Sequence, residues 1–163
     1  SIKDADSSWK KADDVHIVDY NNNYQIGDLQ IETLKSTDEG VAFILKTDGL
    51  SIYHAGDLHW WEFSDREEAR NQENTRNYKE EIHKIVGRRF DIAFVVLDPR
   101  QEEKYGEGLD LFLSEAGARY VFPMHLWGRY DLIPDYKSRN QLKYVTSQIM
   151  DIRYPGQTFE LVL

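Results

Sequence analysis

The sequence has no cysteine, little basic charge and no long hydrophobic run, and each absence excludes a class of protein. Without cysteine among its 163 residues, the chain has no disulfide framework, no thiolate zinc site, no iron–sulfur cluster and no cysteine nucleophile. Its longest apolar runs fall far short of the roughly 20 residues that a membrane helix needs. The chain therefore reads as a soluble protein with no membrane partner.

The balance of charge excludes a second class of partner. Lys and Arg total 20 against 29 Asp and Glu, which gives a formal net charge of −9. No basic run interrupts this excess, so we expect no nucleic-acid partner. Residues 1–14 are polar and charged and do not resemble a signal peptide. We expect one cytoplasmic domain over residues 1–163.

The first third of the chain has the pattern of short strands. Apolar and polar residues alternate over residues 29–34, and residues 41–45 are continuously apolar. Asp48 and Gly49 predict a hairpin turn, because glycine adopts positive φ without steric cost. We expect a four-stranded antiparallel meander, in which residues 24–28 form a turn into the second strand. The expected strands are residues 15–18, 29–34, 41–45 and 50–54.

The rest of the chain alternates between helical and strand patterns. Residues 65–86 lack Gly and Pro, and Ser64 or Asp65 is the expected N-cap. A mixed α/β domain follows, with helices packed on one face of a sheet. The expected helices are residues 65–86, 109–116 and 136–150, the last with Leu142, Val145 and Ile149 on one stripe. The expected strands are residues 92–97, 120–122 (ended by Pro123) and 159–162.

Polar side chains directly after predicted strands are the first candidates for a site. Gly56 and Asp57 follow one strand, and His125 follows another. A carboxylate and an imidazole at neighbouring strand ends suit a divalent metal. Two other interpretations remain open: an Asp after Gly is also a common turn former, and a lone His is often purely structural.

The two strand ends carry a family resemblance. Residues 51–57, SIYHAGD, and residues 121–125, VFPMH, resemble the metallo-β-lactamase superfamily. The branch that they resemble is the hydrolases akin to the ascorbate-6-phosphate lactonase group. Residues 34–43, 52–61 and 91–100 look like the same branch, so the resemblance covers nearly the whole chain.

The resemblance implies a fold and an activity. The fold would be a portion of an αββα sandwich, and the activity hydrolysis of a small ester, lactone or phosphate-bearing metabolite by metal-bound hydroxide. Asp57 would bridge two metals and act in catalysis, and His125 would bind the second. The cofactor would be zinc or another divalent metal, two per complete site.

Two departures from the family pattern limit this implication. The main metal motif of the family, His-x-His-x-Asp-His, is absent from the sequence. Asp38 stands near the place where the family has another histidine, and it would be a substitute ligand. With only Asp57, His125 and Asp38 available, we expect this chain alone to bind metal weakly or not at all. A complementing N-terminal fragment or a homo-oligomer would change that.

Side chains around Asp57 and His125 are candidates for contacts with a small-molecule substrate. Two adjacent Trp residues on a strand cannot both face one core, because side chains alternate. The open alternatives are packing for the Trp residues, an exposed loop for the His residues and a plain surface position for Arg100. The candidates are His54, His59, Trp60, Trp61, Arg100 and Trp127.

Two other functions remain as alternatives. A chain with half of a site would also suit a non-catalytic interaction or regulatory module that self-associates through exposed sheet. Part of the superfamily cleaves RNA, but the net charge of −9 and the lack of a basic patch argue against a nucleic-acid enzyme.

Overall fold

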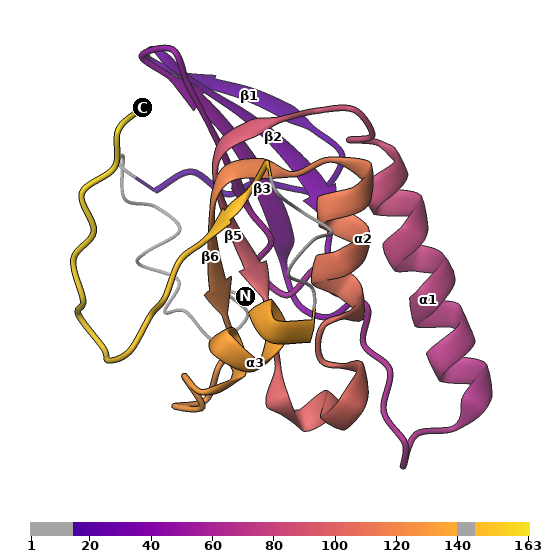
Figure 1. Cartoon of the computed structure of the whole chain (residues 1–163). Helices are drawn as coiled ribbons and strands as arrows, with labels where there is room; N and C mark the ends of the chain where they lie inside the picture. The colour runs from indigo at the N-terminus through magenta and orange to yellow at the C-terminus, as the bar shows by residue number, and fades with distance from the viewer. Residues whose placement is uncertain (1–14, 140–145) are drawn as a thin grey trace.

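A computed structural model describes residues 15–139 and 146–163, which form a seven-stranded sheet with three α-helices (Figure 1). The strands are β1 (Asn23–Ile26), β2 (Leu29–Lys35), β3 (Val41–Thr47), β4 (Leu50–His54), β5 (Phe90–Val96), β6 (Ala118–Met124) and β7 (Gln148–Ile149). The helices are α1 (Glu68–His83), α2 (Glu107–Glu115) and α3 (Leu132–Arg139), and a short 3₁₀ helix covers Pro99–Lys104. None of the helices in these two ranges has the length and apolar character needed to cross a bilayer.

The sheet is mixed, and its strands lie side by side in chain order. β1 to β4 form an antiparallel meander, whereas β4 to β7 run parallel. Parallel neighbours need a crossover, and α1 and α2 supply it between β4 and β5 and between β5 and β6. The predicted mixed α/β class is therefore confirmed, and an antiparallel meander of four strands is present, but its first strand is not the predicted one.

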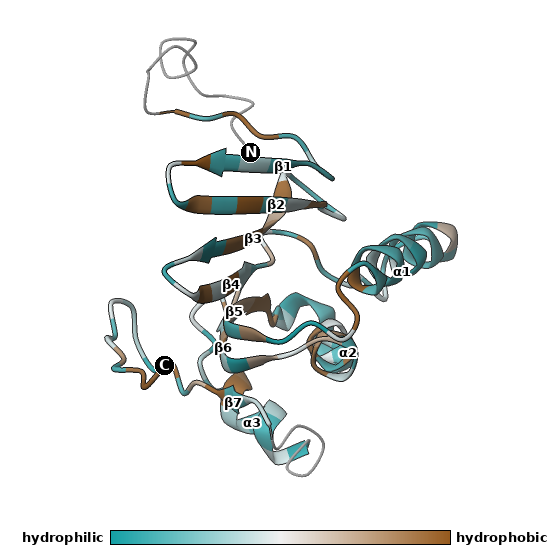
Figure 2. Ribbon diagram, turned by 90° about the horizontal axis from the view of Figure 1, so that it is seen from above, coloured by the Kyte–Doolittle hydropathy of each residue, from teal (hydrophilic) through white to brown (hydrophobic). Residues whose placement is uncertain are grey.

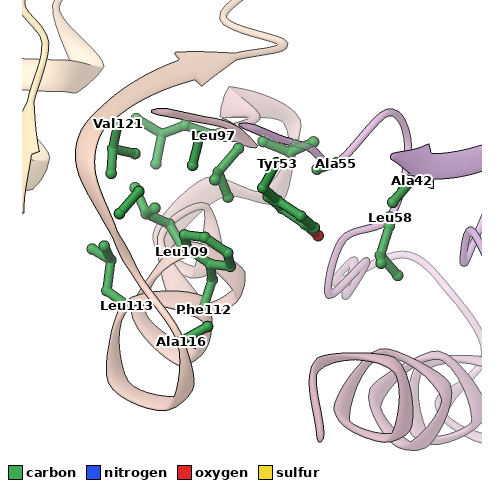
Figure 3. Close-up of a cluster of buried hydrophobic side chains, with 14 of the residues drawn as sticks. Ala42, Tyr53, Ala55, Leu58, Leu97, Leu109, Phe112, Leu113, Ala116 and Val121 are labelled. Carbon is green, nitrogen blue, oxygen red and sulfur yellow. The ribbon is translucent and has the colours of Figure 1, made fainter. Parts of the chain in front are cut away.

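One face of the sheet is covered by helices. Alternate residues of β3 to β6 are fully buried on the side of the sheet that carries α1 and α2, and several of them are drawn in Figure 3. Tyr78 and Ile82 of α1 and Phe112 of α2 fill the space between the layers. The helices thus pack on one face, as predicted. The sheet residues of this helix-covered face are Ala42, Ile44, Tyr53, Ala93, Val95 and Val121.

The opposite face is apolar but only half-buried. The C-terminal segment runs on this side of the sheet, away from α1 and α2 (Figures 1 and 2). There the Phe159 ring packs edge-on against Phe122, with 5.3 Å between centroids. We call this surface the open face. Its residues are Val41, Phe43, Leu45, Ile52, His54, Ile92, Phe94, Phe122 and Met124.

Both predicted terminal strands are wrong. Residues 15–18 have no strand pairing, and the first strand is β1, whose four residues lie where a turn was expected. Residues 159–162 also lie outside the sheet. The Phe159 ring contacts Phe122 of the open face instead, and the Val162 carbonyl accepts a hydrogen bond from the Tyr120 hydroxyl. An apolar pattern alone cannot distinguish a strand from an extended segment that packs on a sheet.

The predicted helix boundaries also shift. Glu67, not Ser64 or Asp65, precedes the first turn of α1. The helix predicted over residues 136–150 is wrong at its C-terminal end, because Ile149 lies in β7 and pairs with Val121 of β6. Residues 1–14, Leu142 and Val145 lie outside the described residues. β6 continues through Pro123 because β7 pairs only with Tyr120 and Val121, so no ladder bond on that side needs the missing N–H.

Candidate active site

The candidate site lies where three adjacent parallel strands end. β4, β5 and β6 are in register, with His54 beside Phe94 and Phe94 beside Phe122. The segments that follow them carry Asp57, Asp98 and His125. The carboxyl ends of adjacent parallel strands form one sheet edge, so the three side chains meet there.

Gly56 fixes the turn that delivers Asp57. Its φ is +54°, and a Cβ at this position would lie 2.7 Å from the Val41 carbonyl oxygen. Any side chain would therefore both strain the backbone and collide with β3. The Gly56 N–H donates to Nδ1 of His54 at 3.0 Å. His54 thus supports the turn, with the proton of the neutral ring on Nε2.

Asp57 and His125 contact each other directly. Nε2 of His125 lies 3.1 Å from Oδ1 of Asp57, and the two side chains are 26% and 33% exposed, so solvent reaches both. His125 has a φ of +60°, an uncommon conformation for a residue with a side chain. Such strain persists only where the surrounding structure holds it, and it concentrates at functional sites.

Asp98 is the third member of the group, and sequence reasoning assigned it no role beyond a turn. Its carboxylate is fully buried, and Oδ2 lies 3.7 Å from Nδ1 of His125. The Arg100 guanidinium donates to both carboxylate oxygens, and the Trp127 indole N–H donates to Oδ2 at 3.1 Å. Burial alone would raise the pKa of Asp98, but these hydrogen bonds outweigh it and lower the pKa. Asp98 therefore stays negatively charged behind His125.

Three of the predicted substrate-lining residues, Trp61, Arg100 and Trp127, lie close to this group. The Trp61 ring lies 5.9 Å from the His125 ring, and its indole N–H donates to the Asp57 carbonyl at 2.9 Å. The Arg100 guanidinium lies 4.8 Å from the Trp127 ring centroid. Trp127 is 68% exposed, which leaves most of its ring available to a ligand.

The other predicted lining residues lie elsewhere. His59 is fully buried, and its Nε2 lies 2.6 Å from Oε1 of Gln101. Its lining role is corrected to packing, because the segment after Asp57 turns inward between α1 and α2. The Trp60 indole donates to Thr75 of α1. His54 remains near the site and lines a pocket together with Asp57 and His125.

The predicted third metal ligand does not join the other two. Asp38 is exposed in the loop after β2, and no three His, Asp or Glu side chains within residues 15–139 and 146–163 are placed to hold a metal together. Two ligand atoms of one tetrahedral zinc lie about 3.3 Å apart. The 3.1 Å between Asp57 and His125 is consistent with that spacing. The described residues therefore fit two ligand positions of a zinc site and leave the set incomplete.

Two pockets flank the Asp57–His125 pair. The first, about 790 Å³, is mostly apolar; it lies over the open face and includes His54, Asp57 and His125. The second, about 350 Å³, lies between the loop after β2 and the start of α1. We call the second the arginine pocket. It is lined by Thr37, Asp38, Trp61, Phe63, Arg66, Arg70, Glu73, Asn74, Asn77 and Arg100.

Comparisons with known proteins give only distant similarity. No protein-family model and no curated protein matches the sequence. The structure is similar to a Thermotoga maritima protein classed as a zinc-dependent hydrolase of the metallo-β-lactamase superfamily, with 17% identity and a TM-score of 0.43. It is also similar to Zn²⁺-bound PqqB from Methylobacterium extorquens, with 11% identity and a TM-score of 0.36. The matches cover 68% and 66% of this chain but only 48% and 39% of those chains.

Proposed function

We propose that this chain carries part of the active site of a metal-dependent hydrolase of the metallo-β-lactamase type. The observation that carries the proposal is the 3.1 Å contact between Asp57 and His125 at an accessible sheet edge. The sequence contexts of both residues resemble that superfamily. The substrate would be a small ester, lactone or phosphate-bearing metabolite.

The chain's own side chains would hold and orient the metal. Asp57 would supply a carboxylate oxygen and His125 its Nε2, with further ligands from groups other than the described residues. The bound metal would polarise the scissile carbonyl or phosphoryl oxygen and generate hydroxide at neutral pH. With a metal held between Asp57 and Nε2 of His125, the negative charge of Asp98 near Nδ1 would favour a proton on Nδ1 and leave the Nε2 lone pair for the metal.

Zinc titration of the purified chain tests the proposal. Calorimetry should show weak, saturable binding in the unsubstituted chain, because two ligands hold zinc poorly. Asp57→Asn and His125→Gln should each abolish it. His83→Gln is the matched control, since His83 is an exposed histidine at the end of α1. Zinc binding that is undetectable before substitution, or unchanged in both site variants, would contradict the proposal.

The open face favours a second candidate, a non-catalytic module that self-associates. Nine apolar or aromatic side chains of β3 to β6 are only half-buried there. A surface of that kind is typical of an interface. Light scattering over a range of concentrations checks this candidate. A monomer at every concentration would exclude self-association, whereas a dimer that binds no zinc would favour the module over the hydrolase.

A further inference from the structure

The arginine pocket concentrates positive charge in an acidic protein. Three of its ten lining residues are arginines, whereas the whole chain has a net charge of −9. We propose that this pocket binds the oxyanion group of a small molecule, a phosphate or a carboxylate. The proposal adds a substrate class to the proposed hydrolase and rests on it only for the link to catalysis.

Two of the three guanidinium groups have no carboxylate partner within the described parts of the chain. The Arg66 guanidinium lies over the Phe63 ring, 4.3 Å from its centroid, and both residues line the pocket. Arg70 follows in the first turn of α1 and lines the same pocket. Neither forms an ion pair with a described Asp or Glu. Their charges are thus free for a ligand.

Arg100, in the 3₁₀ helix after β5, is the third arginine of the lining. Its Nε and Nη2 atoms bind Asp98, so the remaining N–H groups stay available. Asp38 and Glu73 also line the pocket, so its lining carries three positive and two negative charges, and Asp98, which is not part of the lining, pairs with Arg100. The unpaired guanidinium groups of Arg66 and Arg70 therefore supply the positive charge for a ligand. A phosphate group has three acceptor oxygens and nearly two negative charges. It matches three guanidinium groups better than a carboxylate does, so phosphate should bind more tightly.

Trp61 links this pocket to the Asp57–His125 pair. Its ring lines the arginine pocket, lies 5.9 Å from the His125 ring, and its N–H donates to the Asp57 carbonyl. The Arg100 guanidinium lies 5.7 Å from the centroid of the same indole. Only the Trp61 ring would therefore separate an anionic group in the pocket from the proposed metal ligands Asp57 and His125.

Titration of the ¹⁵N-labelled chain with inorganic phosphate tests the proposal. Ionic strength is held constant with sodium chloride, and the arginine Nε–Hε signals are followed by NMR. Saturable shifts are expected for Arg66, Arg70 and Arg100. Arg66→Gln and Arg70→Gln should each weaken phosphate binding about tenfold, as expected for loss of one charge-assisted hydrogen-bonding group.

Arg76→Gln is the matched control, because Arg76 is an exposed arginine of α1 outside the pocket. It should change phosphate affinity less than twofold. An acetate titration distinguishes the two oxyanions: weaker binding than phosphate supports a phosphate ligand, and tighter binding a carboxylate one. Shifts that do not saturate, or equal losses in Arg76→Gln and the pocket variants, would overturn the proposal. No metal or turnover is involved, so this test fails or succeeds independently of the zinc titration.

Discussion

The two faces of the sheet use alternate residues of the same strands and differ sharply in burial. On the helix-covered face, Tyr53 stacks on Phe112 and Phe90, with ring centroids 4.8 and 5.5 Å apart. On the open face, the rings of Phe94 and Phe122 also stack, at 5.3 Å, but both stay half-buried. Similar aromatic pairing therefore occurs in a packed interior on one side and near solvent on the other.

The difference in burial suggests that one face stabilises the fold and the other is available for contacts. Burial of apolar area stabilises the fold mainly where water is fully excluded, so the helix-covered face should dominate stability. The open face keeps apolar surface available for contacts. The candidate site lies at the edge that both faces share, with the arginine pocket toward α1 and the apolar pocket over the open face.

The largest effect should come from emptying the helix-covered face. Phe112→Ala removes a fully buried ring and should lower the free energy of unfolding by about 3–5 kcal/mol. Phe94→Ala on the open face should cost only about 1–2 kcal/mol, since the ring is already partly hydrated. Urea unfolding of both variants measures the difference. Equal losses would break the comparison between the faces.

An intermediate effect is expected from pH. Burial lowers the pKa of His59 to about 4, despite its hydrogen bond to Gln101. The unfolded chain binds this proton near pH 6.5, so the stability from neutral His59 is present above that pH. It should fall by up to about 3 kcal/mol as the pH drops to 4. Unfolding of the unsubstituted chain and of His59→Gln across this range should show a shallower pH dependence in the variant.

His54 provides the comparison on the open face. Burial also lowers its pKa, with a smaller contribution from the charge of His125. Because the side chain is only half-buried, His54→Gln should leave most of the acid-induced loss of stability in place. If His54→Gln changed the pH dependence of stability more than His59→Gln, the expected difference in burial between the open face and the helix-covered side would be contradicted.

Polar substitutions on the open face should have the smallest effect on stability but should clearly reduce the binding of an apolar dye. Phe94→Gln and Phe122→Gln should each reduce the fluorescence of bound Nile red, a neutral dye for apolar surfaces, because they make the open face polar. Val86→Gln is the control, since Val86 is an exposed apolar residue after α1. Dye binding that falls equally in the control would show that the open face is not the preferred apolar surface.

Much of the central fold could be predicted from local patterns. The apolar run over residues 92–97 predicted the strand that the structure shows as β5. Tyr78, Ile82 and Ile85 are spaced as on one face of the helix predicted over residues 65–86, and all three are buried. These patterns report burial within one segment, which is why they succeed in the interior of the sheet. The alternation of helical and strand patterns also predicted the mixed α/β class.

Edges could not be predicted, because a strand needs a partner that its own sequence does not specify. Residues 15–18 and 159–162 have strand-like composition, yet the sheet ends before either can pair. Conversely, Gln148 and Ile149 extend the sheet although their surroundings have a helical pattern. Pairing over two residues is decided by β6, not by local propensity.

The part of the candidate site that could be predicted consists of side chains that directly follow a strand. The meeting of Asp57 and His125 follows from their positions after β4 and β6. Asp98 had the same signature, a carboxylate after a buried run, but its neighbour Pro99 favoured a turn interpretation. Arg66 and Arg70 were missed because their convergence with Arg100 depends on where α1 packs.

Arg100 belongs to both halves of the site, since it binds buried Asp98 and lines the arginine pocket. A ligand that draws its guanidinium away from Asp98 changes the field at His125, 3.7 Å from that carboxylate. Binding free energies around a closed thermodynamic cycle must sum to zero. If an anion in the arginine pocket changes the affinity for a ligand at His125 by some factor, the ligand at His125 must therefore change the affinity for the anion by the same factor. Through Arg100, a ligand in the arginine pocket and a ligand at His125 would each change the affinity of the protein for the other.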